Sequence, residues 1–103
     1  MFDMMKLMKQ AATMKRDLER VKKRMADKTV EFSTGGTITV TAACDGTIRR
    51  IKIAPQSVDP SRVDALEKAM LAAVNGALGE ARRVMEKEMS ALTAGMDIPG
   101  LTG

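Results

Sequence analysis

The side chains of this sequence that could do chemistry are mainly cationic. The chain has 17 lysine and arginine residues against 13 aspartate and glutamate residues, and it has no histidine. Residues 1–28 hold nine basic and four acidic side chains, whereas the other residues hold eight basic and nine acidic ones. The positive excess therefore lies entirely in the first segment, where a polyanionic partner would be attracted.

Few residues are suited to catalysis. Without histidine the chain lacks the commonest general base and metal ligand. The single Cys44 lies in an expected turn without a neighbouring base; it excludes an internal disulfide and fits a reducing compartment. Carboxylates such as Glu86 and Glu88 alternate with basic residues, as on a solvated helix face, and no Walker-type glycine loop occurs. We expect no enzyme activity, no metal and no other cofactor.

An unbroken apolar repeat runs through the basic segment. Apolar residues recur at alternating steps of three and four, the heptad pattern of a coiled coil, and Asp3 is suited to cap a helix over residues 3–28. Such a helix is about 39 Å long and would project from a compact domain of about 26 Å. A projecting apolar seam needs a partner, which we expect to be a second copy. The predicted dimer interface comprises Met4, Leu7, Ala11, Met14, Leu18, Val21 and Met25.

The helix face opposite this seam is basic. The three heptad positions farthest from the seam are Lys9, Arg16 and Lys23, and a smaller basic group (Arg82, Arg83, Lys87) lies in the second half of the chain. An ordinary solvated face is one interpretation, although it would usually mix both signs of charge. The residues that we predict to contact DNA are Lys9, Lys15, Arg16, Arg20, Lys23, Arg24, Arg82 and Arg83.

Duplex DNA is the polyanion that the composition favours. A membrane-surface helix needs bulky, usually aromatic, residues opposite its charge, and the chain has two Phe and no Trp or Tyr. The same shortage argues against base stacking on single strands or RNA loops. No Asn or Gln lies along the basic face to read base edges. We therefore expect phosphate contacts with little sequence preference, no membrane partner and no small-molecule substrate.

The middle of the chain has the pattern of strands. Residues 29–54 alternate apolar and polar side chains, with turn residues at Gly35–Gly36 and Asp45–Gly46, and Pro55 ends the pattern. This predicts a three-stranded antiparallel meander. In its third strand, strict alternation places Arg49 with Ile51 and Ile53 on one face and Ile48 with Arg50 and Lys52 on the other.

A second helical region is predicted over residues 60–93. Asp59 is suited to cap it and Pro60 to its first position. Gly76 and Gly79 either permit close packing or divide the region into two helices. We thus expect one α+β domain over residues 1–95 and a flexible tail at 96–103. The chain shows no membrane-spanning run and no signal-peptide pattern, so we expect it in the cytoplasm.

The order of these features resembles the YbaB/EbfC family of bacterial nucleoid-associated proteins. The resemblance rests on four segments in order, "LMKQAATMKRDLERVKKRM", "GGTITVTAACDGTIRRIKIAP", "LAAVNGALGEARRVMEKEM" and "TAGMDIPGL". It implies a tweezer-like homodimer in the nucleoid that binds duplex DNA with relaxed sequence preference. Its DNA contacts carry over to the basic side chains of the first helix and to Arg82 and Arg83.

One alternative function belongs to another class. Methionine side chains adapt to varied partners, and Met5 and Met8 lie beside the seam. A dimeric protein–protein adaptor or chaperone-like module with no role on DNA would use such a surface.

Overall fold

The chain folds as a helix, a three-stranded sheet and a second helix. The computed structural model describes residues 3–94. Its elements are α1 (Met4–Asp27), β1 (Thr29–Thr34), β2 (Ile38–Ala43), β3 (Ile48–Ile53), the 3-10 turns Pro55–Ser57 and Pro60–Arg62, and α2 (Val63–Ala94). The strands form an antiparallel sheet in the order β1-β2-β3. The predicted α+β class is confirmed, and the predicted tail at 96–103 lies outside the described residues.

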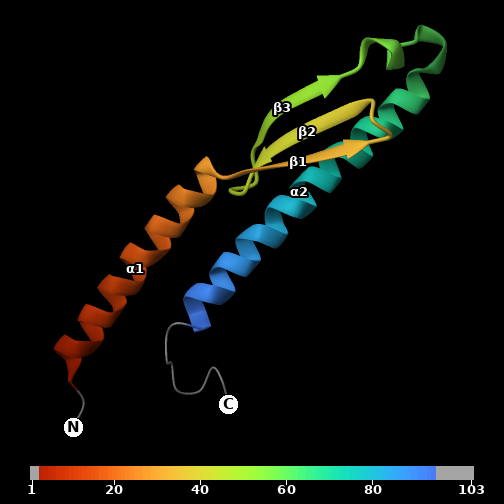
Figure 1. Ribbon diagram of the computed structural model, residues 1–103. Helices are drawn as coiled ribbons and strands as arrows, with labels where there is room; N and C mark the ends of the chain where they lie inside the picture. The colour runs from red at the N-terminus through yellow and green to blue at the C-terminus, as the bar shows by residue number, and fades with distance from the viewer. Residues whose placement is uncertain (1–2, 95–103) are drawn as a thin grey trace.

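The molecule is elongated. Figure 1 shows α2 lying along one face of the sheet while α1 leaves the sheet and projects beyond it. The principal extents are 73 × 26 × 16 Å, and the radius of gyration is 20.0 Å. A compact chain of this length has a radius of gyration of about 13 Å. Much of α1 therefore lies away from the core, as its length predicts.

Both ends of α1 are defined by local hydrogen bonds. The Asp3 carboxylate accepts from the backbone N–H groups of Met5 (3.2 Å) and Lys6 (3.3 Å), which is the predicted N-cap. At the other end Lys28 turns extended, and its N–H donates to the Arg24 carbonyl at 3.1 Å. The helix thus occupies the predicted span to within one residue at each end.

A β-bulge corrects one prediction about β3. Thr41 pairs with Arg50 but Ala42 pairs with Ile48, so Arg49 is an extra residue in this strand. An extra residue reverses the alternation of side chains beyond it. Ile48 therefore shares the face of Ile51, not that of Arg50 as strict alternation predicted.

The turn next to this bulge is held by Asp45. Its carboxylate accepts from the Thr47 hydroxyl at 2.6 Å and from the Thr47 N–H at 3.0 Å, and these hydrogen bonds lower the pKa of Asp45. Gly46 supplies the positive φ of +93° that the turn requires.

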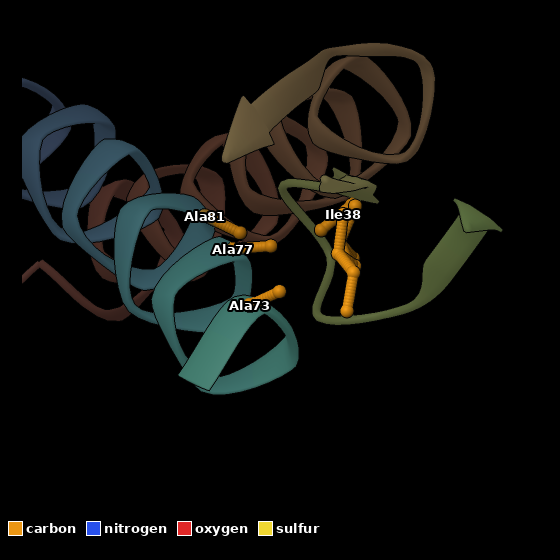
Figure 2. Close-up of a cluster of buried hydrophobic side chains, with 6 residues drawn as sticks. Ile38, Ala73, Ala77 and Ala81 are labelled. Atoms are coloured by element: carbon orange, nitrogen blue, oxygen red, sulfur yellow. The ribbon is translucent and has the colours of Figure 1, made fainter. Parts of the chain in front are cut away.

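The main core is a thin layer between β2 and α2. Figure 2 shows the buried side chains of this layer, including Ile38 and three alanines that follow one another at four-residue steps. Small side chains on one helix stripe allow the α2 backbone to approach the sheet closely. The buried residues are Ile38, Val40, Ala42, Ala73, Ala77 and Ala81.

Gly76 extends this close approach to β1. A Cβ atom at Gly76 would lie 2.6 Å from the Phe32 Cζ atom and nearer still to two other ring carbons. Gly79 has nothing within 4 Å of the same position, and α2 runs unbroken through both glycines. Of the two predicted roles, Gly76 serves close packing, and neither glycine divides the helix.

We predict opposite effects of the same substitution at the two glycines. Gly76→Ala should lower the free energy of unfolding by about 1–3 kcal/mol, because the new methyl group overlaps the Phe32 ring. Gly79→Ala should raise it by about 0.8–1.0 kcal/mol, because alanine favours an exposed helix interior. Urea unfolding at one fixed protein concentration measures both. Equal effects at the two positions would contradict the packing role of Gly76.

Candidate nucleic-acid interface

The last turns of α1 are anchored to α2 by a second buried cluster. Val21, Met25 and Cys44 are its buried members. The partly buried side chains packed against them are Val30, Val84, Met85, Met89 and Leu92. Burial raises the pKa of the Cys44 thiol, which keeps it in the neutral form suited to an apolar cluster. This cluster connects the projecting helix to the body.

The anchoring divides the predicted dimer seam into two parts. Val21 and Met25 are buried against α2 of the same chain, although the heptad pattern placed them at a contact between copies. Met14 and Leu18 are partly buried, and Ala11 is exposed. Met4 and Leu7 are 69% and 44% exposed, respectively, so the beginning of the seam is the part left without an intrachain partner. A heptad repeat does not specify which chain supplies the opposite face.

Two polar contacts fix the direction in which α1 projects, and an ion pair holds the donor of one of them. Arg24 donates to the Glu88 carboxylate on α2 at 2.7 Å. Arg49, the bulge residue, donates to the Ala26 carbonyl in the last turn of α1 at 3.2 Å and pairs with Asp45 at 3.4 Å. The Arg49 guanidinium thus lies at the C-terminal end of α1, where the helix dipole places partial negative charge. We call the projecting helix α1 the arm. The C-terminal end of this arm is therefore held by contacts from both the sheet and α2.

The predicted DNA-contacting residues are all exposed, but their surroundings differ. Arg20 lies 3.8 Å from Asp17 in a loose ion pair, and Arg24 is bound by Glu88. Arg83 donates to Glu80 at 2.9 Å, and this contact raises the pKa of Arg83. The remaining predicted residues form no ion pair within residues 3–94; they are Lys9, Lys15, Arg16, Lys23 and Arg82.

The fold brings one further pair of cations together. Lys28, at the end of α1, and Lys87, on α2, line a cleft of about 300 Å³. Its other lining residues are Arg83, Val84, Glu88 and Ala91. The sequence analysis did not single out Lys28, because this residue lies beyond the last residue of the heptad seam. Its approach to α2 depends on how the two helices pack. The spacing of Lys87 four residues after Arg83 was the available signal, since such residues share a helix face.

Two other features are absent from the described part of the chain. Residues 3–94 contain no group of three or more histidine, cysteine, aspartate or glutamate side chains arranged to hold a metal ion. Neither helix, over its described residues, combines the length and apolar character needed to cross a membrane.

We predict that the second cluster contributes strongly to stability. Met25→Ala should lower the free energy of unfolding by about 2–5 kcal/mol, because it leaves a cavity where α1 is anchored. Met8→Ala, at an exposed position of the same helix, should change it by no more than about 0.5 kcal/mol. Urea unfolding followed by circular dichroism gives both values. Similar values for the two variants would show that the anchoring cluster is not a stabilising contact.

Comparison with known proteins agrees with this arrangement. The model of the YbaB/EbfC DNA-binding family matches residues 1–96. A nucleoid-associated protein of Acetivibrio thermocellus is 46% identical over 97 residues, which are 92% of this chain and 86% of the relative. One from Alkaliphilus metalliredigens is 40% identical over 100 residues, covering 96% and 88% of the two chains. The crystal structure of an uncharacterized protein from Helicobacter pylori covers 93% of this chain and 98% of its own, with a TM-score of 0.71 and 18% identity, and so supports the fold alone.

Proposed function

We propose that this chain, which belongs to the YbaB/EbfC DNA-binding family, is a nucleoid-associated protein that binds duplex DNA as a homodimer. In this proposal the contacts are made to phosphates and carry little sequence preference. The protein would act in the nucleoid of a bacterial cytoplasm, as the names of its relatives suggest. The observation that carries the proposal is a row of exposed cations along a helix that projects from the core.

The state of these cations supports phosphate binding. Lys9, Arg16 and Lys23 lie two turns apart along α1, are exposed, and form no ion pair within residues 3–94. Such side chains can exchange mobile counterions for phosphates without first breaking an internal contact. Arg24 and Arg83 differ, because each would have to leave or share its carboxylate.

Two exposed apolar surfaces support self-association. One is the beginning of the seam on α1, at Met4 and Leu7. The other is β3, which is an edge strand. Its Ile48, Ile51 and Ile53 lie on the same face of the sheet as α2, but α2 covers this face only over β1 and β2 and leaves β3 exposed. The unpaired backbone groups of an edge strand can pair with another chain, and exposed apolar patches mark sites of protein–protein contact. A second copy that covers either surface would give a dimer with two projecting α1 helices.

The first prediction from this proposal concerns salt. If about four phosphates are neutralised per subunit, log K should fall with log salt concentration with a slope of about −7 for the dimer. Fluorescence anisotropy on a duplex of arbitrary sequence, repeated at several chloride concentrations, measures the slope. An affinity that does not change with salt would exclude phosphate binding.

The second prediction separates DNA binding from an adaptor role. The combined change Arg16→Glu, Arg20→Glu and Lys23→Glu should abolish DNA binding, because it reverses the charge along the exposed face of α1. Circular dichroism and sedimentation equilibrium should show an unchanged fold and unchanged self-association. A triple variant that still binds duplex DNA would contradict the proposed surface, and an adaptor with a non-acidic partner would tolerate the change.

The third prediction tests the two apolar surfaces. At least one of the variants Ile51→Asp and Leu7→Asp should weaken self-association more than tenfold, because each places a charge in one of the two proposed apolar contact surfaces. Thr39→Asp is the matched control, since Thr39 pairs with Lys52 on the polar face of the same sheet. Sedimentation equilibrium gives the dissociation constants. Dimers as tight as those of the control in both variants would place the interface elsewhere.

A further inference from the structure

The cleft between the end of α1 and α2 differs from the exposed row of cations. It is a concavity of about 300 Å³ whose charged groups come from both helices: Lys28 from the end of α1, and Arg83 and Lys87 from α2. Val84 and Ala91 give part of its wall an apolar surface. A phosphate group entering it would be met by cations from two directions, which the straight row on α1 cannot provide.

The charge of this cleft is positive even when its carboxylates are counted. Glu88 is the acidic residue in the lining, and Arg24 already binds it at 2.7 Å. Arg83 is shared with Glu80, whereas Lys28 and Lys87 form no ion pair within residues 3–94. Three cations and one carboxylate therefore line the space, while Arg24 and Glu80 lie outside the lining as ion-pair partners, and two of the lining cations are free of carboxylate contacts.

The backbone around Lys28 is compatible with an anion. The end of a helix normally presents carbonyl groups and partial negative charge, which would repel a phosphate. Here the Arg24 carbonyl accepts from the Lys28 N–H at 3.1 Å, and the Ala26 carbonyl accepts from Arg49 at 3.2 Å. The Lys28 carbonyl accepts from the Cys44 N–H at 2.8 Å, so the main chain that carries this lysine is fixed.

We propose that this cleft is a binding site, the phosphate seat, for one phosphate of the DNA backbone, which Lys28, Lys87 and Arg83 hold. The bound phosphate would compete with Glu88 for Arg24. This inference rests on the proposed function and adds an anchor point at the base of each arm. Arg24 is not part of the lining, but as the ion-pair partner of Glu88 it is a further candidate contact, because an incoming phosphate and the Glu88 carboxylate offer it similar acceptors. DNA bound along α1 would then also contact α2, and its position relative to the body would be fixed.

The test compares two pairs of substitutions that remove equal charge. Lys28→Gln with Lys87→Gln should weaken binding to a random duplex about tenfold and reduce the salt slope by about 1 per cleft. Lys52→Gln with Lys68→Gln, on the polar sheet face and on an exposed part of α2 away from the cleft, is the control and should change affinity much less. Both double variants should unfold at the urea concentration of the unmodified protein.

A second comparison uses a gain of affinity. Glu88→Gln should tighten DNA binding about threefold, because it removes the negative charge from the cleft, while the glutamine oxygen can still accept a hydrogen bond from Arg24 and keep α1 in place. Glu86→Gln changes the net charge equally on the same helix and should have a smaller effect. Equal effects of these two variants, or of the two lysine pairs, would overturn the phosphate seat. Failure of the unmodified protein to bind duplex DNA would instead overturn the proposed function.

Inorganic pyrophosphate tests whether the cleft accepts only a small free anion. If the proposal holds, pyrophosphate added to isotope-labelled protein should shift the backbone amide NMR signals of Lys28 and Lys87. Added DNA should then displace the pyrophosphate and reverse its shifts. Pyrophosphate shifts that persist when DNA is bound would place the phosphate contacts of DNA elsewhere and contradict the seat.

Discussion

The packing of the last two turns of α1 against α2 determines most of what this molecule can present to a partner. α1 is joined to the sheet through one extended residue, Lys28, and its first half has little to pack against. Val21 and Met25 supply the apolar contact, and the Arg24–Glu88 ion pair and the Arg49–Ala26 hydrogen bond fix the angle. Without this contact the cations of α1 would have no defined position relative to those of α2.

Two different kinds of close packing serve the two halves of the structure. The contact between α2 and the sheet uses alanines and Gly76, so the helix backbone comes near the strands and Phe32 fits over the glycine. The contact between α1 and α2 uses long methionine side chains, which fill an irregular space between two helices. The first kind of packing leaves little freedom for substitution, whereas the second tolerates changes of side-chain shape.

The sequence alone predicted the elements well because each has a strong local signal. The heptad steps and Asp3 located α1, and the period-two alternation with its glycine turns located the strands. Relations between distant segments were not accessible in this way. The bulge at Arg49 has no glycine to mark it, the role of Gly76 depends on Phe32, which lies more than 40 residues earlier, and the burial of Met25 depends on which chain supplies the opposite surface. For the same reason the sequence indicated the exposed cations but not the cleft that Lys28 shares with α2.

The length of the arm sets a scale for contact with a double helix. The cations from Lys9 to Lys23 span 14 residues of α1, which is about 21 Å at 1.5 Å per residue. One turn of B-form DNA rises about 34 Å. On the proposed function, a single arm therefore follows the backbone for less than one turn and crosses at most one groove. Contact with a longer stretch of DNA would require several arms bound next to one another. The length of DNA that is covered would therefore depend on how many molecules bind side by side.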